Sequence, residues 1–217
     1  MPRFRVFALS WLILFACSAS ARSQDHTIIA LSHSNHTVYE VDPATGKILH
    51  EFVAPDQPHE AAITSDGATI FASIPAGAFV EILDGRTFKE KGRIETEHFK
   101  RSPPNTSASP HGMALNNDNS KLYIGTENAD IPGVTVYDVK AGKVLKKIDV
   151  VLQGGHYLAI QPRTDKLYYP HRTDNRVVVI DTKTDRIVKI IPVAGGRLAS
   201  RSRRTATCGS TKTATDR

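Results

Sequence analysis

The sequence predicts an all-β protein built from repeated antiparallel units of four short strands. Three observations lead to this prediction. Short segments alternate between apolar and polar residues, turns rich in Gly, Asp and Asn separate them, and the whole pattern recurs at an interval of about 43 residues. Beyond the first 21 residues, no segment shows a helical apolar period over 11 residues.

One strand of each unit is rich in β-branched residues and ends in aspartate. These aspartates follow one another at intervals of 42, 54 and 43 residues, and the longer middle interval contains the polar, Pro- and Ser-rich segment 95–109. We interpret that segment as a loop inserted between strands. The aspartates are expected to accept backbone N–H bonds in Asx-turns rather than to act as catalytic carboxylates. They are Asp42, Asp84, Asp138 and Asp181.

A second recurring segment begins at residues 58, 110 and 155 and contains a short apolar strand and an Asp-containing turn. Another strand follows it each time, at 69–73, 121–125 and 166–169. A four-stranded sheet with apolar residues on both faces must stack on its neighbours to bury them. The prediction is therefore a partial β-propeller of about 3.5–4 four-stranded antiparallel blades. The first blade starts at Thr27 with what should be its second strand.

Particular motifs carry a resemblance to a known family. Pro-His-Gly at 110–112, Leu-Tyr-Ile at 122–124 and Asp-Asn-Arg-Val-Val-Val-Ile-Asp at 174–181 follow the order of YVTN β-propeller repeats. The chain resembles that family over about residues 27–196. The resemblance implies a bacterial, exported propeller whose intact ring has more blades than these residues supply. It implies little about activity, because such repeats serve many proteins.

The first 21 residues have the features of a signal peptide. Arg3 and Arg5 precede an apolar run of roughly 11 residues, too short for a bilayer that takes about 20, and Ala19-Ser20-Ala21 offers a cleavage site. We expect export to the periplasm or the extracellular space. Residues 14–17 also resemble a lipoprotein cleavage box, so a lipid anchor on Cys17 is the alternative.

The repeats end at about residue 196, and residues 197–217 form a basic tail without alternation. We interpret this tail as disordered or out of frame, the result of a frameshift or truncation; a natural basic tail is the alternative. The chain carries a net charge of +6, of which residues 1–21 contribute +2 and the tail +5. The repeats, residues 22–196, are left with −1, so no nucleic-acid partner is expected.

Three histidines recur at one repeat position, at the start of the innermost strand: His59, His111 and His156. A propeller would bring them to one mouth of its channel. Converging imidazoles there could bind a transition metal or an anionic ligand, or relay protons. The alternative is structural, with each ring hydrogen-bonded to a neighbouring blade. Successive blades are expected to set the rings several ångströms apart, often too far for one ion.

Four more residues join the candidate ligand-binding set at this mouth. Glu60 is the acidic residue expected beside the histidines, and Tyr157 follows His156. His98 and Arg101 lie in the 95–109 loop, where they could hold a carboxylate or a lactone.

Two functions remain open at this point. The first is an exported binding or interaction module with a protein, glycan or small-molecule ligand at the channel mouth. The second is a lactonase-like hydrolase, with a divalent metal ion. The sequence contains no Gly-x-Ser-x-Gly, P-loop, dinucleotide, haem-attachment or metalloprotease motif, so no cofactor is identified beyond a divalent or transition metal. An open array of blades is also expected to self-associate through its exposed edges.

Overall fold

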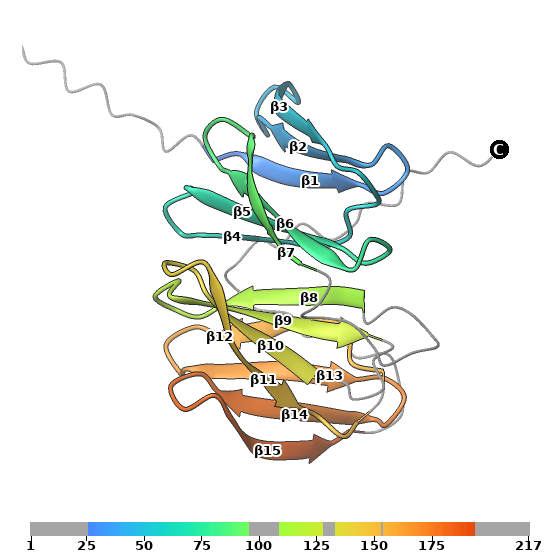
Figure 1. Ribbon diagram of the computed structural model, residues 1–217, viewed down its shortest axis with the longest axis vertical. Coiled ribbons are helices and arrows are strands. Elements are labelled where there is room, and N and C mark those ends of the chain that lie inside the picture. Colours follow the sequence, from blue (N-terminus) through green and yellow to red (C-terminus); the bar gives the residue numbers. More distant parts are fainter. Residues whose placement is uncertain (1–25, 96–108, 128–132, 153, 194–217) are drawn as a thin grey trace, which may run out of the picture.

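The computed structural model describes residues 26–95, 109–127, 133–152 and 154–193. In this part of the chain, fifteen strands form four antiparallel sheets without any helix, which confirms the all-β prediction. The sheets are stacked in chain order along the long axis of the molecule (Figure 1). None of the described residues belongs to a helix long and apolar enough to cross a membrane. The predicted signal peptide, the basic tail and loop residues 96–108 lie outside the described residues.

Three sheets contain four strands in sequence order, β4 to β7, β8 to β11 and β12 to β15, and the described residues of the first sheet form three strands, β1, β2 and β3. Among the described residues, the first sheet thus has no counterpart of β4, β8 and β12, and β1 is equivalent to the second strand of the other sheets, as predicted. The strands are β1 (Ile28–Ser32), β2 (Thr37–Val41), β3 (Ile48–Val53), β4 (Ala61–Ile63), β5 (Thr69–Ile74), β6 (Phe79–Asp84), β7 (Glu90–Ile94), β8 (Ser109–Leu115), β9 (Lys121–Glu127), β10 (Gly133–Asp138), β11 (Lys143–Asp149), β12 (Ala159–Gln161), β13 (Lys166–His171), β14 (Arg176–Asp181) and β15 (Arg186–Pro192).

The repeat is visible in the backbone as well as in the sequence. In every sheet, the two outer strands shift register immediately before the repeat aspartate, for example between Glu40 and Val41. Each aspartate then accepts backbone N–H bonds from the turn that follows. The Asp42 carboxylate accepts one from Ala44 at 2.8 Å, and the Asp138 carboxylate one from Ala141 at 2.7 Å. The predicted Asx-turns are therefore confirmed.

Side chains from facing sheets interlock to form the core. Between the first two sheets lie Val38, Ile70, Leu83 and Phe88; between the second and third lie Phe71, Val80, Met113, Leu122 and Tyr137; and between the third and fourth lie Tyr123, Val134, Leu167, Tyr169 and Val178. Fully burying one such apolar side chain contributes about 1.5–3 kcal/mol. No single sheet buries its own faces, so the sheets depend on stacking, as the alternation predicted.

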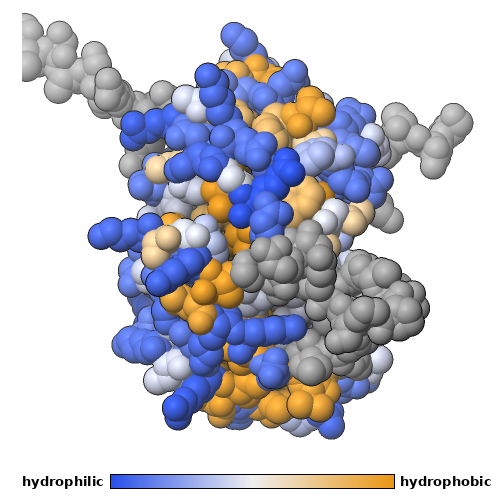
Figure 2. Space-filling view, in the orientation of Figure 1, coloured by the Kyte–Doolittle hydropathy of each residue, from blue (hydrophilic) through white to orange (hydrophobic). Residues whose placement is uncertain are grey.

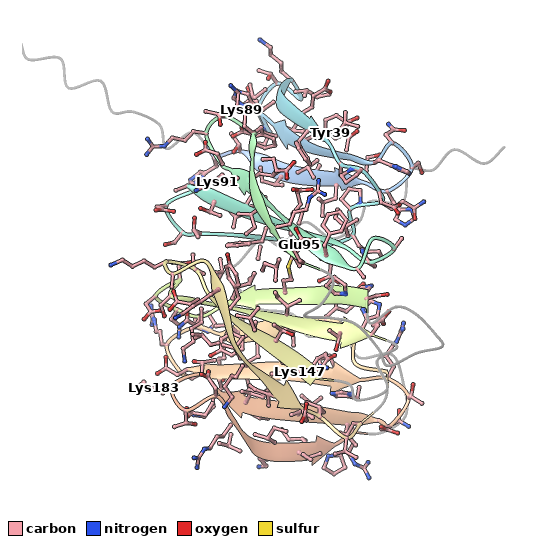
Figure 3. The ribbon with its side chains drawn as sticks, viewed as in Figure 1. Tyr39, Lys89, Lys91, Glu95, Lys147 and Lys183 are labelled. Carbon is pink, nitrogen blue, oxygen red and sulfur yellow. The ribbon has the colours of Figure 1, made fainter. Side chains whose placement is uncertain are left out.

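The outer strands present charge to solvent. Lys91 of β7 and Lys147 of β11 are exposed, and Figure 3 shows both on the outer strands of their sheets. Lysines on an edge strand discourage further pairing along that edge. The opposite edges of these sheets are formed by β4, β8 and β12, which approach one another. Together they make up the inner edge of the stack, where the recurring histidines meet.

Candidate functional site

The three histidines occupy equivalent positions because the same backbone pairing recurs in successive sheets. His111 lies in β8, while His59 and His156 lie just before β4 and β12. The His59 N–H donates to the carbonyl of Ser73 at 2.9 Å, and the His156 N–H donates to the carbonyl of Pro170 at 3.3 Å. Each segment is thus held extended against the second strand of its own sheet, and each ring starts from the same edge.

Gly112 allows the third and fourth sheets to meet closely at this edge. Its N–H donates to the carbonyl of His156 at 3.1 Å. A Cβ atom at position 112 would lie only 2.3 Å from that carbonyl oxygen, closer than real Cβ contacts permit. The glycine of Pro-His-Gly therefore brings the His111 and His156 segments into direct contact.

The imidazole rings converge more closely than expected from the sequence. The ring centroids of His59 and His111 are 4.1 Å apart, and those of His111 and His156 are 3.9 Å apart. The outer pair, His59 and His156, are separated by 6.5 Å. His111 is therefore the central ring, and each of its neighbours is near enough to share an ion with it.

Two carboxylates complete the cluster, one on each side of His111. Glu60 Oε1 lies 3.0 Å from His111 Nδ1, and Glu127 Oε2 lies 3.9 Å from His111 Nε2. The other Glu127 oxygen, Oε1, lies 3.4 Å from His156 Nε2 and 3.0 Å from the Arg172 guanidinium. These side chains are largely buried. Only 5–18% of the surface of each is exposed in His111, His156, Glu60 and Glu127.

Glu127 was missed at the sequence level, where Glu60 was the only acid expected beside the histidines. It is six residues beyond Lys121, which pairs with the repeat aspartate Asp138. The equivalent residues of the other sheets are His33, Pro75 and Arg172. Two of these also border the cluster, since Arg172 contacts Glu127 and the His33 ring lies 6.0 Å from that of His59. Extending the repeat alignment by two residues past the second strand would have revealed this position.

Burial keeps His59 and His156 neutral. Desolvation, together with the neighbouring His111 ring, lowers the pKa of His156 to about 3, and Arg172 and His59 add to this effect. Desolvation, His111 and His33 lower the pKa of His59 to about 4. Burial also raises the pKa of Glu60, although the nearby His111 opposes that shift. The imidazoles of His59 and His156 thus offer lone pairs at neutral pH rather than positive charge.

Several buried polar atoms at this site lack a hydrogen bond within the described residues: Nδ1 of His111, Nδ1 of His156 and Oε1 of Glu60. The first and last of these face each other at 3.0 Å, close enough to pair when Nδ1 carries a proton and to bind the same ion when it does not. Buried polar atoms are nearly always paired, so atoms left in this state call for a ligand or ion.

The ligand atoms form two overlapping groups, His59, Glu60 and His111, and His111, Glu127 and His156. Within each group, the candidate ligand atoms lie within 4.8 Å of one another. Two nitrogens and a carboxylate oxygen suit zinc and other first-row transition metals, whose ligand atoms lie about 2.0–2.2 Å from the ion. At tetrahedral angles such ligands are roughly 3.4 Å apart, so small side-chain movements would close either group around an ion.

Of the remaining candidate ligand-binding residues, the structure describes only Tyr157. The Tyr157 ring lies 4.1 Å from that of His156 and 6.1 Å from that of His111, so it borders the cluster. Burial raises the pKa of its phenol, which is therefore a neutral hydrogen-bond donor at neutral pH. His98 and Arg101 lie outside the described residues.

Comparison with known proteins shows the class of fold. No protein-family profile matches the chain, and no curated protein matches it. Among solved structures it is similar to Kuenenia stuttgartiensis hydrazine synthase, with a TM-score of 0.63 and 21% identity over 73% of this chain and 44% of that one. It is also similar to the structure of U3-55K, with a TM-score of 0.64 and 13% identity over 78% of this chain and 49% of that one.

Both structures have folds of the β-propeller type, and the chain spans about half their length. The four stacked sheets are therefore propeller-type blades, and the chain is an all-β protein of partial-propeller architecture. At 21% and 13% identity, these likenesses establish the fold alone. The YVTN assignment stays a resemblance in sequence.

Proposed function

We propose that this protein is an exported propeller-type binding module that holds a divalent transition-metal ion through the histidine and glutamate side chains at its inner edge. The observation that carries the proposal is the pair of His₂Glu groups, each of which places two histidines and a buried or half-buried carboxylate within reach of one ion. Neutral imidazoles and carboxylates are ligands that zinc, copper and nickel accept.

Metal binding to purified protein tests this proposal. After treatment with chelator and dialysis, zinc titration followed by elemental analysis should show bound zinc, and His111→Ala should reduce the affinity at least tenfold. His50→Ala is the matched control, because His50 Nδ1 contacts Glu40 Oε2 at 2.7 Å in another His–Glu pair, away from the cluster. Equal zinc binding by the parent chain and His111→Ala would contradict the proposal.

A lactonase-like hydrolase is the second candidate function. An ion held by three protein ligands keeps a position open for water, and lowers the pKa of that water enough to make a nucleophile near neutral pH. Glu60 and Glu127 both lie beside such an ion site. Metal-dependent lactone hydrolysis that is lost in His111→Ala would favour the hydrolase. Metal binding without turnover would favour the binding module.

The proposal includes export, supported by the signal-peptide features of residues 1–21. Expression in a bacterial host, fractionation and N-terminal sequencing test this part separately. The expected product is a periplasmic or secreted chain that begins after Ala21. A cytoplasmic chain that retains Arg3 and Arg5 would overturn it. Palmitate labelling at Cys17 would instead identify a lipid-anchored form.

A further inference from the structure

The central imidazole of the cluster faces both candidate groups at once, through different ring nitrogens. His111 Nδ1 faces Glu60, and His111 Nε2 faces Glu127. These two nitrogens point outward on opposite sides of the ring, so one ion cannot lie on both of their lone pairs. The two groups that share His111 therefore describe two ion positions rather than alternative ligands for one ion.

We propose that the site is dinuclear, with the imidazole of His111 bridging two divalent metal ions; this inference rests on the proposed metal-binding function. His59, Glu60 and Nδ1 of His111 would hold the first ion. Nε2 of His111, Glu127 and Nε2 of His156 would hold the second. A bridging imidazole uses both nitrogens as acceptors, so His111 releases its remaining ring proton to solvent when the second ion binds.

The distances on each side of the ring agree with this assignment. Glu60 Oε1 lies 3.0 Å from Nδ1, a spacing close to that of two ligands adjacent on one ion. On the other side, Glu127 oxygens lie 3.9 Å from His111 Nε2 and 3.4 Å from His156 Nε2. These spacings bracket the roughly 3.4 Å expected between tetrahedral ligands.

Charge and orientation also favour two ions over one. Two divalent ions carry four positive charges. Glu60, Glu127 and a bridging imidazolate would carry three negative charges beside them and so neutralise most of that charge. Arg172 contacts only Oε1 of Glu127, at 3.0 Å, which leaves Oε2 directed to His111. Such an outer contact fixes the orientation of a ligand without replacing the metal.

Zinc stoichiometry and copper paramagnetism, measured on the full chain, test the inference together. We expect two zinc ions per chain, and one ion per chain in either Glu60→Gln or Glu127→Gln, with His50→Ala unchanged. With copper, the first equivalent should give an electron paramagnetic resonance signal, and the second should abolish most of it through coupling across the imidazolate. Circular dichroism and thermal unfolding check that each variant is folded.

Each outcome decides between the two claims. One ion per chain in the parent protein overturns the dinuclear site and leaves the proposed metal-binding function intact. Two ions whose copper signals simply add overturn the bridge. Absence of bound metal contradicts the proposed function itself. If His111→Ala does not fold, the two glutamate variants still count the ions on each side of the ring.

Discussion

At the scale of single residues, the inner edge combines groups that separately are common in proteins but here share one small volume. His111 is buried between two carboxylates, and His59 and His156 flank it. Burying three imidazoles and two carboxyl groups here costs desolvation free energy, which a bound ion would offset. The same arrangement also makes the stability of the metal-free protein depend on pH.

Acidification should destabilise the metal-free protein. An unfolded histidine has a pKa of about 6.5, and that of His156 in the fold is about 3, so the unfolded chain binds more protons between these values. Stability is therefore fully present above pH ~6.5 and falls as the pH drops below it, by up to about 1.4 kcal/mol per pH unit for this residue. Denaturant unfolding between pH 7.5 and 5 in the presence of chelator measures this slope.

The variant His156→Asn should flatten that dependence, because it removes the histidine whose pKa is lowered furthest. His59, His111, Tyr157, Glu127 and Arg172 all lie around His156, so part of the slope should persist in the variant. A parent protein whose free energy of unfolding is constant from pH 7.5 to 5 would contradict the prediction.

Gly112→Ala should damage both the fold and the site. The added methyl group would meet the His156 carbonyl, so the third and fourth sheets must separate or shift at the cluster. Overpacking of this kind costs roughly 1–3 kcal/mol. The free energy of unfolding should fall by that amount, and zinc affinity should fall with it. Unchanged unfolding and zinc affinity would show that the two segments are less closely packed than described.

At the scale of strands and turns, the third residue of the second strand in the second and third sheets contacts the sheet that follows. Phe71 of β5 packs against Tyr137, and Tyr123 of β9 donates to Asp185 at 2.5 Å in the turn between β14 and β15. Lys121 contacts the same aspartate at 2.7 Å. The sequence shows the equivalence of these positions, but only the stacked sheets show that they contact the following blade.

Tyr123→Phe should destabilise the stack. It removes a buried hydroxyl that donates to Asp185 and leaves Lys121 as the remaining donor to that carboxylate among the contacts described. Hydrogen bonds to charged groups contribute about 1.5–3 kcal/mol, so the free energy of unfolding should fall within that range. Tyr168→Phe is the matched control at the same repeat position, since its hydroxyl bonds Gln161 in an exposed setting. Equal losses in both variants would argue against the contact between sheets.

Sequence patterns predicted the elements well because the repeat amplifies weak local signals. The register of Asp42, Asp84, Asp138 and Asp181 located one strand of every sheet, and the recurring segments that contain His59, His111 and His156 located the inner edge. Glu127 was not predicted as a site residue because its repeat equivalents are a histidine, a proline and an arginine. The position therefore shows no shared side-chain chemistry that would mark it. The short distance between the imidazole rings could not be predicted from the sequence either, because it depends on how closely Gly112 allows adjacent sheets to approach.

At the scale of the whole molecule, the described sheets form a stack with exposed apolar side chains on its terminal sheets. Val188 and Ile190 of β15 are 52% and 48% exposed, and Ile48 of β3 is 51% exposed at the other end. Hydrophobic surface (orange) lies towards both ends of the molecule in Figure 2. Exposed apolar surface of this kind favours association.

Self-association should therefore be measurable and should depend on the last strand. Analytical ultracentrifugation of the chain is expected to show dimers or larger species at micromolar concentration. The double variant Val188→Lys and Ile190→Lys should shift the chain towards monomer. Lys147→Ala, on the outer strand β11, is a control that leaves these end faces unchanged. A parent chain that sediments as a monomer at every concentration would contradict the prediction.

The most direct test of the central claim is anomalous diffraction at the zinc absorption edge from crystals of the zinc-loaded chain. We predict two anomalous peaks, one on each side of the His111 ring, each beside a glutamate carboxylate. A single peak would retain the metal site and remove the bridge. Crystals that bind zinc only away from His59, His111 and His156 would contradict the claim that this inner edge is a metal site.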